Sequence, residues 1–338
     1  MEPGARLEWL LSGGELPEEE ISALCQSLVA GRLEATELAG LVVALRAKRE
    51  TGREMAAFAR SLIGVAQAFP TPHYPFADSC GTGGDRRGTL NISTGVAFLA
   101  AACGLPIAKH GNRSVSSRSG SADVFEQLGI PLSLTPDRAR ACLDEAGLCF
   151  LFAPDYHPGL RHAMPVRQAL GIRTVFNLLG PLLNPARPPI QLVGVYDPDC
   201  TESVAQALGE LGRSRAIVLH GSGIDEMALH GPTRLSILRD GVIENRILEP
   251  ASLGIPTYPL EALEGGDAAA NTRALADLLD GRAKPAYAWS VALNTGALLW
   301  IAGRSETLAE GIDQAHATLE AGGARKVLSR LQEVAARA

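Results

Sequence analysis

The feature that most restricts the fold of this chain is a change of hydrophobic periodicity at a proline-rich segment, FPTPHYPF, residues 69–76. Before this segment, apolar residues recur three and four positions apart, as they do on one face of a helix. After it, short apolar runs of strand length alternate with helical stretches. Successive X-Pro pairs favour extended chain and end helices. We therefore predict a helical domain over residues 1–72 and a second domain over residues 76–338.

The first domain is predicted to contain at least three helices. One apolar face consists of Ile21, Leu24, Cys25, Leu28 and Val29, and a second consists of Leu38, Leu41, Val42 and Leu45. Gly31 is expected to end the first of these helices in a left-handed conformation. Thr51 and Glu54 have the spacing of a capping box, which predicts a third helix through MAAFARSLIGVAQAF.

The second domain reads as α/β. Strands are predicted at LPIAKHG, LCFLFAP, IQLVGVY and RAIVLHG, and helices at GVAFLAAACG, SADVFEQLG, TPDRARACLDEAG and VALNTGALLWIAG. We expect Ser121 and Thr135 to be N-caps, with Pro136 in the first turn. Strands that alternate with helices predict a central, mostly parallel sheet that is flanked by helices on both sides.

The amino-acid composition limits the partners and the cellular location that we expect. The 338 residues are 46% hydrophobic, which allows a large core, and the formal net charge of −6 argues against a nucleic-acid or anionic-membrane partner. No Cys-x-x-Cys pair occurs among Cys25, Cys80, Cys103, Cys142, Cys149 and Cys200, so they read as reduced, mostly buried thiols. The start of the chain does not read as a signal peptide, and no apolar stretch approaches the length of a membrane span. We expect a cytoplasmic protein.

The glycine-rich segment DSCGTGGDRRGTLNIST, residues 78–94, is the first candidate ligand site. Its glycines allow a ligand to approach the backbone closely, and it leads into a helix whose free N–H groups attract anions. The segment does not match Gly-x-Gly-x-x-Gly, because Arg86 occupies the third glycine position, and it lacks the Gly-Lys-Ser/Thr of a nucleotide P-loop. The alternative is a surface turn with an ordinary Ser/Thr cap.

A second candidate follows in KHGNRSVSSRSGS, residues 109–121, where Lys109, Arg113 and Arg118 stand among five serines. Basic side chains among short hydroxyl donors suit a phosphate. The alternative is a solvated basic loop. Because both segments follow a strand and precede a helix, they are predicted to lie at the ligand-binding edge of the sheet. Two anion sites indicate a ligand with phosphate at two ends.

Two further segments add candidate residues. Asp225 and Glu226, in GSGIDEMAL, would suit a Mg²⁺ ion that bridges them to a phosphate, although an isolated Asp-Glu pair is usually just solvated. The segment YHPGLRHAMPVRQALGIRTVFNLLGPLLNPA contains His157, Arg161, His162, Arg167 and Arg173. Arg167 is placed to project from a mostly apolar helix and pair with a carboxylate. The histidines have an alternative reading as ordinary interfacial residues, and FNLLGPLLNP is expected to be buried.

Together these blocks resemble the anthranilate phosphoribosyltransferase family of tryptophan biosynthesis. The resemblance covers nearly the whole chain and is densest from Asp78 to about Pro185. Gly-Thr-Gly-Gly-Asp alone is shared with related type-III transferases and pyrimidine nucleoside phosphorylases. The resemblance implies a small all-helical domain, completed by a segment near residues 160–190, beside a larger α/β domain. It also implies a homodimer formed through the helical parts, and transfer of the phosphoribosyl group of 5-phosphoribosyl 1-diphosphate to the amine of anthranilate. The products would be N-(5-phosphoribosyl)anthranilate and diphosphate.

The resemblance also implies residue roles. The diphosphate side of the donor would be held by Gly81, Gly84, Asp85, Thr89, Asn91, Ile92, Ser93 and Thr94. The rest of the donor would be held by Lys109, His110, Gly111, Asn112, Arg113, Ser114, Val115, Ser116, Ser117 and Ser121. Anthranilate would contact Gly81, His110, Asn112, Tyr156, His157 and Arg167, its carboxylate pairing with Arg167. Two Mg²⁺ ions per subunit would be bound by Ser93, Asp225 and Glu226, with Glu226 shared. No residue is assigned as nucleophile or base.

The chain departs from the usual family pattern at three positions. Leu90 replaces a phenylalanine, and Arg86 and Arg87 stand where small or polar residues are more usual. These changes alter loop packing or add positive charge near the diphosphate. Two other functions remain as alternatives. A nucleoside phosphorylase would have no use for Arg167, since a nucleobase has no carboxylate, and a non-catalytic nucleic-acid-binding relative should be basic.

Overall fold

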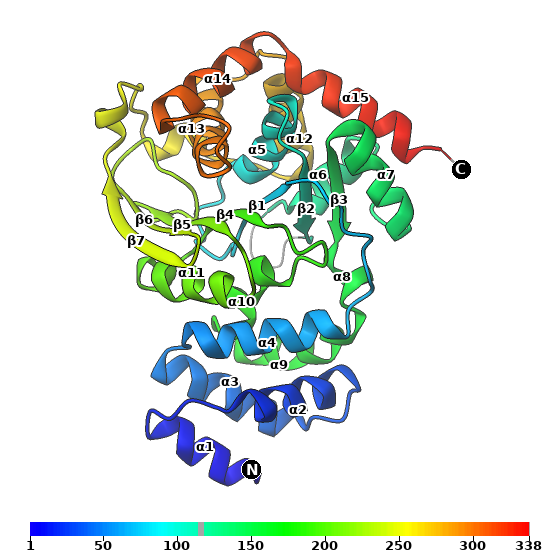
Figure 1. Cartoon of the computed structure of the whole chain (residues 1–338), viewed down its shortest axis with the longest axis vertical. Coiled ribbons are helices and arrows are strands. Elements are labelled where there is room, and N and C mark those ends of the chain that lie inside the picture. The colour runs from blue at the N-terminus through cyan, green and yellow to red at the C-terminus, as the bar shows by residue number, and fades with distance from the viewer. Residues whose placement is uncertain (114–117, 338) are drawn as a thin grey trace.

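The computed structural model describes residues 1–113 and 118–337, and its two parts are distinct in Figure 1. The amino-terminal part is helical: α1 (Pro3–Leu11), α2 (Glu18–Val29), α3 (Ala35–Lys48) and α4 (Gly52–Gly64). The proline-rich segment then leads to β1, the first strand of a large α/β part. The predicted fold class, a small helical part with a larger α/β part, is confirmed.

The helices of the amino-terminal part form where the local signals place them. Ile21, Leu24 and Leu28 are buried along α2, and Gly31 follows its end with φ +68°. The capping box of α4 is present, since the backbone N–H of Glu54 donates to the Thr51 hydroxyl and that of Thr51 donates to the Glu54 carboxylate. The predicted continuation of α4 to Phe69 is wrong. The helix ends at Gly64, and the backbone N–H of Gln67 donates instead to the Tyr156 carbonyl, 2.9 Å away.

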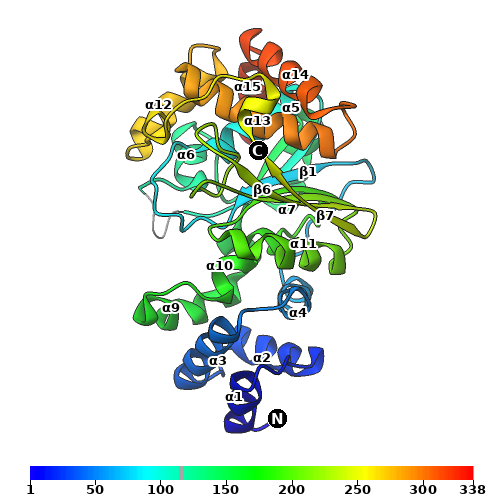
Figure 2. The same cartoon turned by 90° about the vertical axis from the view of Figure 1, so that its left-hand side faces the viewer.

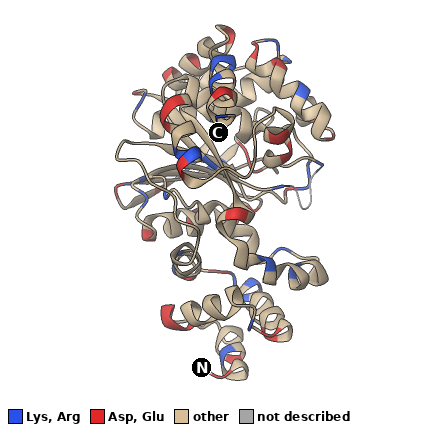
Figure 3. Ribbon diagram, turned by 90° about the vertical axis from the view of Figure 1, so that its right-hand side faces the viewer, with Lys and Arg blue, Asp and Glu red and all other residues tan. Residues whose placement is uncertain are grey.

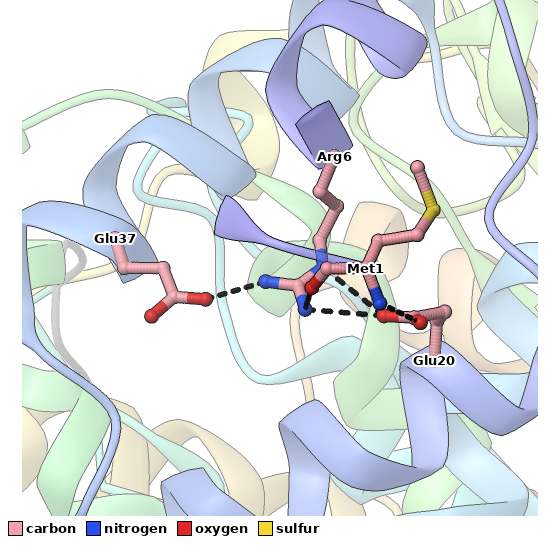
Figure 4. Close-up of polar contacts among 4 residues, drawn as sticks. All are labelled: Met1, Arg6, Glu20 and Glu37. Atoms are coloured by element: carbon pink, nitrogen blue, oxygen red, sulfur yellow. Dashed lines mark hydrogen bonds and ion pairs between the residues drawn. The ribbon is translucent and has the colours of Figure 1, made fainter. Parts of the chain in front are cut away.

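An ion-pair cluster fastens α1 to the next two helices (Figure 4). The guanidinium of Arg6, which is only 8% exposed, donates to the carboxylates of Glu20 on α2 and Glu37 on α3 and to the Met1 carbonyl. The Met1 amino group pairs with the same Glu20 carboxylate. A buried guanidinium needs such partners, because its desolvation is otherwise uncompensated.

The described part of the α/β domain contains one seven-stranded sheet in the order β3-β2-β1-β4-β5-β6-β7. Its strands are β1 (Ala77–Gly81), β2 (Ile107–Gly111), β3 (Leu148–Phe152), β4 (Ile190–Gly194), β5 (Arg215–Gly221), β6 (Thr233–Arg239) and β7 (Val242–Leu248). The first five are mutually parallel, and the last two are added antiparallel. The mostly parallel sheet predicted from the alternation of strands and helices is therefore confirmed.

Helices cover both faces of this sheet (Figures 1 and 2). On the face away from the amino terminus lie α5 (Ile92–Ala102), α12 (Ala268–Leu279), α13 (Pro285–Ile301), α14 (Leu308–Glu320) and α15 (Gly323–Ala335), with α6 (Ser121–Gln127) and α7 (Pro136–Ala146) nearer the β3 edge. The other face carries α10 (Val175–Leu179) and α11 (Thr201–Glu210), and α8 (Ala153–Tyr156) and α9 (Met164–Leu170) lie between the sheet and the amino-terminal helices. As predicted, α13 is buried along most of its length.

One apolar cluster joins the helical part to the sheet. It contains residues of α2, α3 and α4 together with Val193 and Val218 of the sheet and the buried run 175–183. That run overlaps the FNLLGPLLNP segment, residues 176–185, which is buried except at Asn177 and Gly180, so its predicted burial is confirmed. A second cluster fills the opposite face of the sheet, between the strands and α5, α13 and α15.

Two further boundary predictions, at the starts of α6 and α5, were wrong. Gly120 is the N-cap of α6 in place of Ser121, because the Asp123 carboxylate accepts the backbone N–H of Gly120 at 2.9 Å. The helix expected from Gly95 begins at Ile92, which places Ser93 and Thr94 inside its first turn. The Thr135 cap and Pro136 in the first turn of α7 are present as predicted.

The β6–β7 hairpin was not predicted. Its turn is Asp240-Gly241, with both residues at positive φ, as a two-residue hairpin loop requires. The Asp-Gly pair between runs of alternating apolar residues was the available signal.

Surface charge and thiols complete the description. In the view of Figure 3, acidic and basic residues are scattered along the ribbon of both parts. All six cysteines are free, and Cys25, Cys142 and Cys149 are buried. Within residues 1–113 and 118–337, none of the helices combines the length and the apolar character that a membrane crossing requires.

Candidate active site

The candidate site lies where the parallel strands end. Four of these strands finish on glycine: β1 on Gly81, β2 on Gly111, β4 on Gly194 and β5 on Gly221. The chain passes from β1 to β2 and β3 on one side, and to β4 and β5 on the other. This reversal beside β1 is the position where open α/β sheets bind ligands.

The missing side chains at these strand ends make room for the segment that follows β5. A Cβ on Gly81 would meet the Asp225 carboxylate, and a Cβ on Gly194 or Gly221 would meet the backbone of Asp225 or Glu226. Each contact would be well inside the 3.0 Å that side-chain carbons keep from other atoms. Glycine at these positions therefore lets the two acidic residues lie directly against the ends of β1, β4 and β5.

The glycine-rich loop after β1 wraps around Asp225. The backbone N–H of Gly83 donates to Asp225 Oδ2 at 2.7 Å. Gly83 and Gly84 have φ values of +62° and +81°, which only glycine adopts readily. Arg173 holds the loop from the other side, because its guanidinium donates to the Gly84 carbonyl and lies 4.3 Å from the centre of the Tyr196 ring.

The start of α5 faces Glu226. The backbone N–H of Ser93 donates to Glu226 Oε1 at 3.0 Å, so the carboxylate occupies the positive end of this helix. Lys109, which is 2% exposed, extends from β2 with its Nζ 2.6 Å from the Ser79 carbonyl and 3.4 Å from the Ser93 hydroxyl. The structure thus brings Ser93, Lys109 and the two acidic residues together from three separate segments.

Both of these carboxyl groups have raised pKa values. Desolvation, with the nearby Asp85 carboxylate adding to it, raises the pKa of Asp225 to about 7. Desolvation, followed by the charge of Asp225, also raises the pKa of Glu226 well above its usual value. Adjacent carboxylates whose ionised form is disfavoured in this way are a signature of ligand or metal sites.

Two residues that were predicted to bind the phosphoribosyl donor also hold the candidate loops in place. The Asn91 amide donates to the Ser119 carbonyl and its oxygen accepts from Asn271, which ties the two candidate loops to each other and to α12. Thr89 forms an isolated β-bridge with Glu264. Both residues therefore fix the shape of the glycine-rich loop.

The second loop is placed beside the first, at the end of β2. Arg113 pairs with the Asp123 and Glu126 carboxylates of α6 at 2.8 to 2.9 Å. The Asn112 carbonyl accepts from the backbone N–H of Ala122 at 3.3 Å. Ser121 lies within reach of the same carbonyl, with its hydroxyl 3.5 Å away. The predicted positions Ser114, Val115, Ser116 and Ser117 lie outside the described residues.

The residues predicted for anthranilate come from four places, namely the end of β1, the end of β2, the end of α8, and α9. Arg167 on α9 is half-buried, its guanidinium lies 5.6 Å from the centre of the Phe176 ring, and burial lowers its pKa. No carboxylate among the described residues forms an ion pair with it. An unpaired, partly desolvated guanidinium is suited to an anionic ligand.

His110 and His157 form a buried pair next to this region. Their ring centres are 5.5 Å apart, and His157 Nε2 lies 2.7 Å from the Leu183 carbonyl, as an interfacial histidine would. Burial lowers the pKa of His110 to about 3, so the ring is neutral, and its Nε2 has no hydrogen-bond partner among the described residues. Tyr156 is buried, and its hydroxyl also has no described partner.

Sequence reasoning did not assign a role to Arg173, Gly194 or His220. Arg173 was noted only as one of several cations. The glycines that end IQLVG and RAIVLHG were visible, but their importance depends on which strands are neighbours. The register pairs Gly81 with Gly194 across the β1–β4 ladder, and no local pattern reveals that pairing.

This arrangement agrees with known protein families. Residues 73–325 match the a/b domain of the glycosyl transferase family, and residues 7–66 match the helical bundle domain of that family. The fold and the site therefore define a two-domain glycosyl transferase.

Comparison with individual relatives identifies the family more specifically. The anthranilate phosphoribosyltransferase of Sorangium cellulosum is 54% identical over 326 residues, which are 96% of this chain and 94% of the relative. The crystal structure of the same enzyme from Thermus thermophilus superposes with a TM-score of 0.92 at 41% identity, over 98% of this chain and 99% of that one. The Saccharomyces cerevisiae enzyme, solved with PRPP (5-phosphoribosyl 1-diphosphate) and Mg, has a TM-score of 0.88 at 26% identity, over 98% and 97% of the two chains. The chain belongs to the anthranilate phosphoribosyltransferase family, and the resemblance seen in its motifs is confirmed.

Proposed function

We propose that the chain transfers the phosphoribosyl group of 5-phosphoribosyl 1-diphosphate to the amine of anthranilate at the strand-end site described above. This is the reaction of the family to which the chain belongs, a pentosyl transfer. The observation that carries the assignment is the convergence of the glycine-rich loop, the start of α5 and the Asp225–Glu226 pair at one edge of the sheet.

The residues present fit Mg²⁺. Oxygen ligands are what this ion prefers, and it commonly binds one or two carboxylates together with substrate phosphates. Asp225 and Glu226 supply adjacent, partly desolvated carboxylates, and Ser93 supplies a hydroxyl close to them. Within the described residues, no three His, Cys, Asp or Glu side chains form a metal-binding group. We assign two Mg²⁺ per subunit to Ser93, Asp225 and Glu226, and the yeast enzyme with PRPP and Mg supports the choice of ion.

The bound ions would neutralise charge on the diphosphate as it leaves. The chain itself contributes backbone N–H groups from the glycine-rich loop and from the first turn of α5, and these would donate to diphosphate oxygens. Gly81, Gly84, Asp85, Thr89, Asn91, Ile92, Ser93 and Thr94 shape or line this half of the donor site. Lys109, His110, Gly111, Asn112, Arg113, Ser114–Ser117 and Ser121 are assigned to the other half.

In the reaction, the bond between ribose C1 and the diphosphate oxygen breaks as the amine nitrogen forms its bond to C1. The ribose passes through an oxocarbenium-like state, as in other glycosyl transfers. An aryl amine is neutral and needs no nucleophilic residue to activate it, so holding the two substrates in line supplies much of the rate. The Arg167 guanidinium would pair with the anthranilate carboxylate, with Gly81, His110, Asn112, Tyr156 and His157 around the ring.

We also propose a domain division and an assembly. Residues 1–72 with the segment near 160–190 would form the helical domain, and residues 76–338 the donor-binding domain. The packing of α3 against α9, and of α3 and α4 against α10, supports assigning the segment near 160–190 to the helical domain. A homodimer through the helical domain, and a cytoplasmic location without nucleic-acid or membrane partners, complete the proposal.

A fluorescence assay tests the function. Anthranilate emission should fall when the protein is mixed with anthranilate, 5-phosphoribosyl 1-diphosphate and Mg²⁺, and should stay constant when either of the last two is omitted. Constant emission in the complete mixture would refute the assignment. Thymidine with inorganic phosphate serves as the control substrate pair, and no thymine should be released.

A further inference from the structure

The turn immediately before Asp225 has an unusual backbone. Gly221 and Ile224 exchange both backbone hydrogen bonds, at 3.0 and 3.1 Å. The two residues between them, Ser222 and Gly223, have φ values of +46° and +97°, which is the pattern of a type I′ turn. Ser222 carries a Cβ, so the left-handed conformation is unfavourable for it and must be maintained by its surroundings.

His220 holds this turn from the β4 side. Its Nδ1 lies 2.8 Å from the Val195 carbonyl, and its Nε2 lies 3.2 Å from the backbone nitrogen of Gly223. A carbonyl can only accept a hydrogen bond and a backbone N–H can only donate one. The ring is therefore the neutral tautomer with its hydrogen on Nδ1, and its Nε2 accepts from Gly223.

Arg87 holds the carbonyl group of the same residue. Its Nε donates to the Gly223 carbonyl at 3.4 Å, while its own backbone N–H donates to Asp85 Oδ1 at 3.1 Å. Both polar backbone atoms of Gly223 are thus bound by side chains, one from β5 and one from the glycine-rich loop. That loop in turn donates to Asp225 through Gly83.

These contacts do not belong to a packed apolar core. His220, Arg87 and Gly223 border a cavity of about 430 Å³ whose lining also includes Asp85, Tyr196 and Asp197. Arg87 is exposed, and His220 is half-buried. Shortening either side chain therefore removes hydrogen bonds without leaving a hole among buried apolar groups.

We propose that His220 and Arg87 are positioning residues that clamp Gly223, so that Asp225 and Glu226 face the diphosphate site before any ligand binds. This inference rests on the proposed function of those two carboxylates. Because the clamp acts on the carboxylates and not on the anthranilate side, loosening it should weaken ion and donor binding while leaving anthranilate binding unchanged.

Two substitutions at His220 separate its two hydrogen bonds. Asparagine places its amide near the position of Nδ1, so it keeps the contact with Val195 and loses the one with Gly223. Glutamine reaches as far as Nε2 and keeps an acceptor for the Gly223 N–H. His316→Asn is the matched control, because His316 stacks on Trp289 at the far side of the sheet.

The test measures Mn²⁺ binding in the presence of 5-phosphoribosyl 1-diphosphate by the decrease in the EPR signal of free Mn²⁺. The KM for each substrate and the thermal midpoint of each variant are measured alongside. We expect His220→Asn to weaken Mn²⁺ binding and raise KM for the donor by about tenfold, the effect of one lost hydrogen bond near charged groups. KM for anthranilate should not change, and His220→Gln should restore Mn²⁺ binding to within about threefold of wild type. Arg87→Met, which keeps the stem and removes the donors, should weaken Mn²⁺ binding by about threefold, because its hydrogen bond is exposed.

The two proposals fail in different ways. Absence of donor- and ion-dependent turnover in the wild-type protein would refute the proposed function. Normal wild-type turnover with equal Mn²⁺ binding in His220→Asn, His220→Gln and His316→Asn would refute the clamp alone. A lower thermal midpoint together with raised KM values for both substrates in the two His220 variants would also overturn it, because that pattern indicates a general structural role.

Discussion

Replacing Gly81 with alanine would test directly how closely the acidic pair lies against the sheet. The new Cβ would stand 3.0 Å from Asp225 Cγ and nearer still to Oδ2. The carboxylate would have to retreat by roughly 1 Å to reach ordinary contact distance. That movement breaks its 2.7 Å hydrogen bond from the Gly83 N–H.

The expected magnitude follows from these two effects. Loss of one hydrogen bond to a partly buried carboxylate costs about 1–3 kcal/mol of unfolding free energy. A misplacement of roughly 1 Å in a catalytic array lowers turnover by up to about 100-fold. We expect both losses for Gly81→Ala, measured by urea denaturation and by the anthranilate fluorescence assay. Gly64→Ala is the control, because a Cβ there meets nothing within 4 Å, and it should lose neither stability nor activity.

A double-mutant cycle decides whether the Asp225 side chain is the cause. In an Asp225→Ala background the colliding oxygen is absent, and the next contact of the new Cβ is the Asp225 carbonyl at an ordinary 3.5 Å. The stability loss caused by Gly81→Ala should therefore largely disappear. An equal stability loss in both backgrounds, or full activity in the single variant, would refute the reasoning.

Three further predictions address other groups. Arg167→Lys should raise KM for anthranilate by about tenfold and leave KM for the donor unchanged, because an ammonium cannot make the two parallel hydrogen bonds of a guanidinium. Equal changes in both KM values in steady-state assays would contradict this prediction. The pKa of His110 is lowered to about 3 in the fold from an ordinary 6.5, so its neutral form contributes stability above pH 6.5 that is lost as the pH falls towards 3. Between pH 7.5 and 5 the wild type should therefore lose about 2 kcal/mol more unfolding free energy than His110→Gln in urea titrations, and parallel pH profiles would argue against a buried neutral ring. Burial raises the pKa of Cys25 to about 12 and those of Cys142 and Cys200 to about 11. These thiols should therefore resist iodoacetamide at pH 7.5 until urea unfolds the chain. Mass spectrometry of the alkylated protein measures this difference.

Much of the fold was predictable because its signals are local. The capping box at Thr51 and Glu54, the Thr135 cap and the spacing of apolar residues in α2 each depend on residues within one or two turns of each other. The predicted boundaries slipped by a residue or a turn where a neighbouring side chain or a distant backbone group bonded to the end of a helix. Gly120 replaced Ser121 as the cap of α6, because the Asp123 carboxylate reaches the Gly120 N–H, and α4 stopped at Gly64, with the backbone of Gln67 bonded to Tyr156.

The sequence by itself therefore determined many of the helices and strands, and which loops are rich in anion-binding groups. Only the tertiary structure decided that the glycines ending β1, β4 and β5 converge on Asp225 and Glu226, that Arg113 turns to Glu126, and that His220 and Arg87 meet at Gly223. The physical reason is that strand order and register bring together residues more than 100 positions apart. Periodicity and capping act over a few residues, so they carry no information about which strand ends become neighbours.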